Sequence, residues 1–173
     1  MSKKTARAEI ANARWDSRAF GTGEVAKILL IEEWRVKNFA LAKAAGLQPS
    51  RVVGTQKRRI RVFSMFDVVK LALAKDMTIH GFTVDAVGAA VETLNEARLR
   101  EWAGAVENGL HIPVEQKEYL WHDREWELIG HKELQKRHAR VGNDIWHVSV
   151  IDLFRIVQVA TKRIMHGERE GHI

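Results

Sequence analysis

Two short β-type runs, at residues 51–53 and 60–63, enclose a polar and basic segment, and no other feature of the sequence constrains the fold as strongly. Short runs of β-branched and aromatic residues around a polar tip are typical of a β-hairpin. The tip reads Gly54-Thr55-Gln56-Lys57-Arg58-Arg59. The sequence therefore predicts a hairpin with a concentrated positive charge.

Helices are predicted on both sides of this hairpin. Apolar residues at helical spacing predict one helix over 22–29 and a second over 33–45, which a glycine and a proline end. After the hairpin, Ser64 is suited to be an N-cap, and Asp67 follows three residues later in a pattern close to a capping box. The predicted order is helix, turn, helix, hairpin, helix, which is the order of a winged helix-turn-helix.

The second half of the chain indicates a small α+β module. A helix is predicted from Thr83 to about residue 105, and the following glycines and proline mark a boundary. Beyond it, strands are predicted at 119–121, 126–129 and 145–148, and a helix at 149–164. We therefore expect a mainly helical α+β chain, divided into a basic arm (1–19), a winged helix-turn-helix (20–82), a connecting helix (83–108) and a module for oligomerisation or ligand sensing (109–173).

The charge is unevenly distributed along the chain. Residues 1–82 contain 16 Lys and Arg against 7 Asp and Glu, whereas residues 83–173 contain 12 against 15. This asymmetry indicates a polyanionic partner for the first half, and nucleic acid is the commonest such partner. No apolar run approaches the ~20 residues that span a bilayer, and the lack of cysteine excludes disulfides and thiolate zinc sites. We expect a cytoplasmic, nucleoid-associated protein without a membrane partner.

Three segments resemble the DNA-binding domain of the MerR family, in the order and near the spacing found there. Residues 20–27, Phe-Gly-Thr-Gly-Glu-Val-Ala-Lys, are similar to the opening of that domain. Residues 61–71 resemble its segment after the wing, and residues 81–87 resemble the start of its next helix. The resemblance covers about residues 20–95 and implies a winged helix-turn-helix that binds double-stranded DNA. Residues 32–40 lack the family's usual Arg-Tyr-Tyr-Glu core, so no base preference is transferred.

The candidate DNA-binding residues lie on two predicted elements. Helix 33–45 is expected in the major groove, where Arg and Lys suit guanine and Asn suits adenine; its candidates are Trp34, Arg35, Lys37 and Asn38. The alternative is a solvated helix face with Trp34 covering the core. The wing at 54–61 is expected on phosphate or in the minor groove, and the candidates on the wing and its first strand are Arg51, Lys57, Arg58, Arg59 and Arg61.

Self-association is predicted for the C-terminal segment. The predicted helix 149–164 has an apolar stripe, and Trp121, Trp126 and Trp146 lie in a segment too small to bury them alone. A dimer would also let a winged helix read two half-sites. We therefore expect a homodimer or a higher homo-oligomer.

The function expected from these patterns is sequence-specific DNA binding, as a MerR-like transcriptional regulator. A phage-type excisionase or architectural factor, or a small terminase subunit, is an alternative, because these are thought to use similar winged helices. A further alternative is a protein-interaction module that does not bind DNA. The sequence shows no catalytic constellation, and the eight histidines lack metal-ligand spacing on a helix. No enzyme activity, cofactor or metal is therefore expected.

Overall fold

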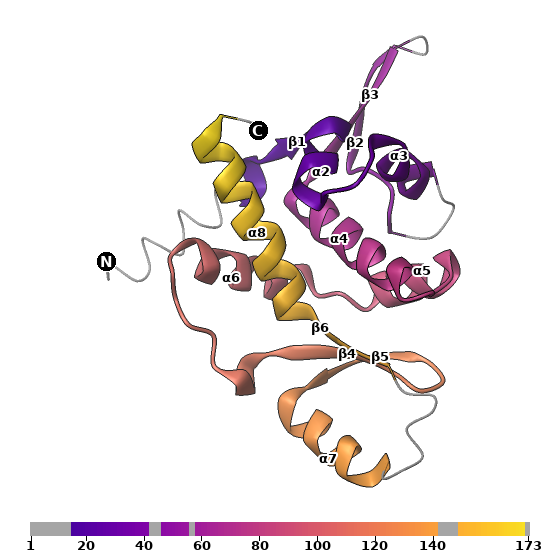
Figure 1. Cartoon of the computed structure of the whole chain (residues 1–173), viewed down its shortest axis with the longest axis vertical. Helices are drawn as coiled ribbons and strands as arrows, with labels where there is room; N and C mark the ends of the chain where they lie inside the picture. Colours follow the sequence, from indigo (N-terminus) through magenta and orange to yellow (C-terminus); the bar gives the residue numbers. More distant parts are fainter. Residues whose placement is uncertain (1–14, 42–45, 56–57, 142–148, 172–173) are drawn as a thin grey trace.

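The computed structural model describes residues 15–41, 46–55, 58–141 and 149–171 (Figure 1). The class predicted from the sequence is confirmed, because the described residues form a mainly helical α+β fold with two small antiparallel sheets, ordered β1-β3-β2 and β5-β4-β6. In chain order the elements are β1 (Ala19–Phe20), α2 (Thr22–Leu29), α3 (Glu33–Leu41), β2 (Arg51–Thr55), β3 (Arg58–Ser64), α4 (Met65–Ile79), α5 (Val84–Glu92), α6 (Glu96–Glu107), the 3-10 helix η1 (Val114–Gln116), β4 (Glu118–His122), β5 (Trp126–Gly130), α7 (His131–Val141), β6 (Ser149–Asp152) and α8 (Leu153–Glu170).

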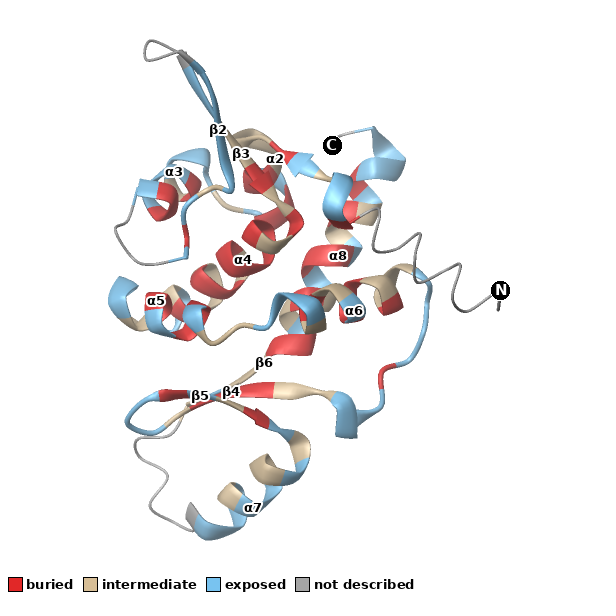
Figure 2. Ribbon diagram, turned by 180° about the vertical axis from the view of Figure 1, so that it is seen from behind, coloured by how far each residue is buried: buried red, intermediate tan, exposed pale blue. Residues whose placement is uncertain are grey.

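The N-terminal half follows the predicted order of elements. Helices α2 and α3 are joined by a short turn, β2 and β3 pair as an antiparallel hairpin, and α4 begins directly after the hairpin. The predicted N-cap is also confirmed, because the Ser64 hydroxyl accepts a hydrogen bond from the Asp67 N–H at 3.1 Å. In Figures 1 and 2 the hairpin projects away from the helices at the end of the molecule where α3 lies. The last part of the predicted helix 33–45, residues 42–45, lies outside the described residues.

The turn between α2 and α3 contains a strained residue. Leu30 has a left-handed backbone with a φ of 52°, although its side chain is 68% exposed and gains little from burial. A side chain with a Cβ is disfavoured in this region, whereas glycine adopts it freely. Leu30 is the C-cap of α2, and its backbone N–H donates to the Lys27 carbonyl at 3.2 Å.

Leu30→Gly is therefore expected to stabilise the fold, by roughly 0.5–1 kcal/mol. Thermal unfolding of the variant and the parent protein measures the effect. Ile79→Gly is the matched control, because Ile79 is also exposed but ends a right-handed helix, and glycine there should cost about 1 kcal/mol. Destabilisation in both variants would show that Leu30 is not strained.

The single helix predicted from Thr83 to about residue 105 is wrong. The structure has two helices, α5 and α6, because Thr93 and Asn95 interrupt the helical hydrogen bonds. The Thr93 hydroxyl donates to the Ala90 carbonyl at 2.8 Å, and the Asn95 side chain accepts from the Arg98 N–H at 3.2 Å as the N-cap of α6. Short polar side chains of this kind compete with the backbone and so favour helix ends. The break frees α6 to pack against α8.

The second sheet confirms two predicted strands, β4 and β5, and corrects the region after them. Helix α7 was not expected from the sequence, and the predicted strand 145–148 lies outside the described residues. The helix predicted from residue 149 begins only at Leu153, because Ser149–Asp152 pairs with β4 as strand β6. Asp152 then caps α8 by accepting a hydrogen bond from the Arg155 N–H at 3.0 Å.

The C-terminal helix α8 belongs to the core of the N-terminal half. One cluster of buried side chains extends from Trp15 to Ile164, and α8 packs against α2, α4 and α6 (Figure 2). The apolar stripe on which self-association was predicted is buried within this chain, at Leu153, Phe154, Val157 and Ile164. The buried part of the stripe therefore offers no surface to a second copy, whereas Val150 is 38% exposed, and self-association stays a prediction.

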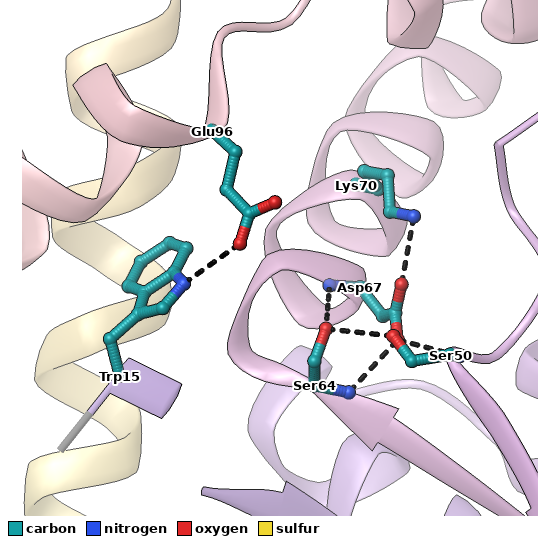
Figure 3. A network of polar contacts seen from close by, with 6 residues as sticks. All are labelled: Trp15, Ser50, Ser64, Asp67, Lys70 and Glu96. Carbon is teal, nitrogen blue, oxygen red and sulfur yellow. Dashed lines mark hydrogen bonds and ion pairs between the residues drawn. The ribbon is translucent and has the colours of Figure 1, made fainter. Parts of the chain in front are cut away.

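The segment before β1 is also packed into the fold. Trp15 is buried, and its indole N–H donates to a Glu96 carboxylate oxygen at 3.2 Å (Figure 3). Arg18 forms ion pairs with Glu107 of α6 and Glu168 of α8. Trp15 and Arg18 belong to the predicted basic arm (1–19), but in the structure their side chains contact helices α6 and α8. No helix in the described ranges is long and apolar enough to cross a membrane.

Candidate nucleic-acid interface

Helix α3 presents a partly apolar face to solvent. Val36, Phe39 and Ala40 are buried against the core, which leaves Trp34, Asn38 and Leu41 on the opposite side of the helix. The Trp34 side chain is 59% exposed, so it does not cover the core. An exposed indole is a large rigid surface for contact with another molecule.

The two cations of α3 lie on opposite flanks of this exposed face. Lys37 is exposed and forms an ion pair with Glu33 one turn earlier, at 3.5 Å, which offsets part of its charge. Arg35 is half-buried on the flank nearer α4, where its charge contributes to lowering the pKa of Lys75. Within the described ranges the Arg35 side chain makes no ion pair or hydrogen bond. Its guanidinium therefore keeps its donors available.

The hairpin distributes its cations over both faces. Residues directly opposite each other on paired strands share a face, and neighbours along a strand alternate. Val52 pairs with Arg61 and Gly54 with Arg59, so these two arginines share one face, while Arg51, paired with Val62, lies on the other. Arg59 and Arg51 are exposed and Arg61 is half-buried. Lys57 lies outside the described residues, and of Arg58 the structure describes only the backbone.

Apart from the pairing of Lys37 with Glu33, the described cations of this region form no ion pairs with acids. The sequence between Glu33 and Asp67 contains eight Lys and Arg and no Asp or Glu. Among the described residues, the side chains of Arg51, Arg59 and Arg61 form neither ion pairs nor hydrogen bonds. Elsewhere in the molecule ion pairs are common, as at Arg18, Arg98, Arg100 and Arg137. Unpaired cations that repel one another indicate a surface suited to a polyanion.

Asp67 ties the base of the hairpin to the start of α4 (Figure 3). Its carboxylate accepts from the Ser50 and Ser64 N–H groups, both at 2.9 Å, and from the Ser50 hydroxyl. It also pairs with the Lys70 ammonium at 2.7 Å. Burial pushes the pKa of Asp67 upward, but Lys70, Ser50 and Ser64 outweigh burial and hold that pKa below its ordinary value. The network therefore joins the residue before β2 and the last residue of β3 to the first turns of α4.

Exposed apolar side chains accompany the cations. Val53 and Ile60 are cross-strand partners on one face of the hairpin, and both are about half exposed. Val52, on the other face, is exposed to a similar extent, as are Leu30 in the turn and Leu41 on α3. Strand and helix patterns do not reveal this exposure, because it depends on which faces the remaining elements leave uncovered. The region is therefore both cationic and apolar.

Comparison with known proteins adds no family assignment, because no protein-family model matches the sequence and no curated protein matches it either. Within the part of the chain that the structure describes, no group of three His, Asp or Glu side chains is arranged to hold a metal ion. The site is thus defined by α3 and the hairpin, together with the Asp67 network that joins the hairpin to the start of α4.

Proposed function

We propose that the chain binds double-stranded DNA through α3 and the hairpin, as a MerR-like transcriptional regulator that acts as a homodimer. The observation that carries the proposal is the acid-free region between Glu33 and Asp67, whose described hairpin arginines are unpaired. Phosphates would neutralise these cations and release counterions, which favours binding. No catalytic role is proposed for the site.

The shapes of the two elements support this proposal. An α-helix fits the major groove, and there the outer face of α3 would bring Asn38 to base edges and Trp34 to sugars or thymine methyl groups. The hairpin carries Arg51 on one face and Arg59 and Arg61 on the other. A ribbon with cations on both faces suits a groove, where phosphates lie on both sides.

Substitutions on the two elements are expected to have different effects on DNA binding. Arg35→Ala or Asn38→Ala should cost roughly 1–3 kcal/mol on a specific site and change binding to random duplex little. Arg59→Ala combined with Arg61→Ala should weaken binding to the specific site and to random duplex alike. The double variant should also reduce the slope of log K against log salt by up to roughly two units. Fluorescence anisotropy at several salt concentrations measures these effects.

The matched control is Arg124→Ala combined with Lys132→Ala, which removes the same charge from exposed positions in the turn between β4 and β5 and on α7. This control should bind DNA almost as the parent protein does. Equal losses of DNA affinity in the two double variants would mean that only the net charge of the protein matters and that the hairpin is not the interface. Genome-wide occupancy separates the biological roles, because promoter sites support a regulator and a phage attachment or packaging site supports the excisionase or terminase alternative.

A protein-binding role is the second candidate, and the exposed apolar side chains of α3 and the hairpin favour it. Leu30, Trp34, Leu41, Val53 and Ile60 together resemble the composition of a protein interface more than that of a solvated surface. Salt dependence distinguishes the two candidates, since phosphate contacts make affinity fall steeply with salt. If the parent protein does not bind duplex DNA at low salt, while Trp34→Ala abolishes self-association in sedimentation experiments, this second function holds.

A further inference from the structure

A groove of about 770 Å³ lies between α4 and α8. Its two walls are single helix faces, formed by Ala72, Lys75 and Asp76 on α4 and by residues spaced three or four apart on α8. Each wall includes one small side chain, Ala72 on α4 and Ala160 on α8. Its volume falls in the range of small-molecule sites, about 300–1,000 Å³.

Two cations stand at the end of the groove where α2 ends. The Lys75 ammonium donates a hydrogen bond to the Leu29 carbonyl at 2.6 Å, and an Arg163 guanidinium N–H donates to the Ile28 carbonyl at 3.3 Å. These bonds cap the last turn of α2, whose carbonyls carry partial negative charge. Each cation uses only one donor in this way, although an ammonium has three and a guanidinium has five. The remaining donors are available to a ligand.

The electrostatics at this end favour an anion. Burial lowers the pKa of Lys75, and Arg163 lowers it further; Asp76 opposes these effects, and Arg35 adds to them. Two cations, Arg163 and Arg35, thus act on Lys75 against the single carboxylate of Asp76. At the far end of the groove, Asp152 is occupied as the N-cap of α8.

The middle of the groove is apolar. Ile156 and Val159 line it from α8, and Leu29 and Phe82 line it from outside the two helices. Val159 is exposed, so its side chain is accessible from solvent. A cationic end continuous with an apolar wall is complementary to a molecule that is anionic at one end and apolar along its body.

We propose that the α4–α8 groove binds a small organic anion, with its carboxylate, sulfonate or phosphate group at Lys75 and Arg163 and its apolar body along Ile156 and Val159. The site does not depend on DNA binding, and it is tested without DNA. The sequence does not reveal it, because Lys75 and Arg163 are far apart in the chain and meet only when α8 packs on α4.

Two fluorescent probes with the same ring system test the charge requirement on the full chain. The anion 8-anilinonaphthalene-1-sulfonate should bind at one saturable site, whereas N-phenyl-1-naphthylamine, which lacks the sulfonate, should bind at least about tenfold more weakly. Equal affinity for the two probes overturns the proposal, and so does the absence of saturable binding of the anionic probe.

Substitutions locate the site. Lys75→Gln combined with Arg163→Gln should weaken binding of the anionic probe by about tenfold or more. Lys162→Gln, at an exposed position on α8, should leave the affinity for this probe unchanged. Because the double variant also loses caps of α2, Val159→Glu provides a second test that keeps both cations. Its carboxylate lies one turn before Arg163, where it suits helix stability and competes for the guanidinium. Unchanged affinity of the anionic probe in Val159→Glu places its binding elsewhere and overturns the proposal.

Discussion

Ile164→Ala is expected to lower the free energy of unfolding by about 2–5 kcal/mol, although Ile164 lies near the end of the C-terminal helix. Ile164 is fully buried in the core that α8 shares with α2, α4 and α6, so the shortened side chain leaves a cavity there. Urea unfolding followed by circular dichroism measures the loss. Val159→Ala on the same helix is the matched control, because Val159 is 39% exposed and its loss should stay within about 0.5 kcal/mol.

Hydrogen exchange shows whether α8 stabilises the N-terminal half. If it does, Ile164→Ala lowers the protection of the slowest amides of α2 and α4 by the same free energy that urea unfolding reports. Truncation after Gly109 should then leave an unfolded chain, because the core loses the whole of α8. Unchanged protection in α2 and α4, or a folded truncated domain, would mean that the two halves are independent.

Asp67→Asn is expected to cost about 3 kcal/mol at pH 7, because Lys70 loses its carboxylate partner in a buried setting. The substituted amide keeps the shape of the carboxylate but not its charge. Asp152→Asn is the matched control, since Asp152 is also a helix cap without an ion pair among the described residues, and Asn caps a helix as well as Asp does. Urea unfolding should place the control within about 0.5 kcal/mol of the parent protein.

The cost of Asp67→Asn should depend on pH. The pKa of Asp67 is below its ordinary value of 3.8 in the folded protein, so its charge stabilises the fold above about pH 4. That contribution is lost as the pH falls through the lowered folded pKa, because the parent carboxylate then becomes protonated as well. The difference between parent and variant should therefore narrow below pH 4. A difference that stays constant from pH 7 to pH 3 would show that the charge of Asp67 is not its source.

The Asp67 network also links stability to the proposed interface. Ser50 precedes β2 and Ser64 ends β3, so the carboxylate holds both ends of the hairpin at the start of α4. Asp67→Asn weakens this attachment while leaving every cation of the hairpin in place. If the hairpin angle matters for binding, the variant loses DNA affinity without a change in the slope of log K against log salt.

Local chemistry made several elements predictable from the sequence. The hairpin follows from two short β-type runs around a polar tip, and the start of α4 follows from Ser64 and Asp67, whose hydrogen bonds join residues three apart. Strands β4 and β5 are short and lie close together in the chain. In each case the interactions that form the element lie within a few residues, so the sequence of that segment contains them. The unpaired basic character of the hairpin was predictable for the same reason, since no acid is nearby in the chain.

Only the tertiary structure decided where the faces of these elements lie. The α8 stripe was visible in the sequence, but whether it meets a second copy or this chain's own α4 and α6 depends on contacts between residues far apart in the chain. Pairing with β4 made Ser149–Asp152 a strand instead of the first turn of a helix. Packing between distant elements also leaves Trp34 exposed and brings Lys75 and Arg163 together at the end of α2. A sequence pattern shows that a side chain is apolar or charged, but packing of distant elements determines what that side chain meets.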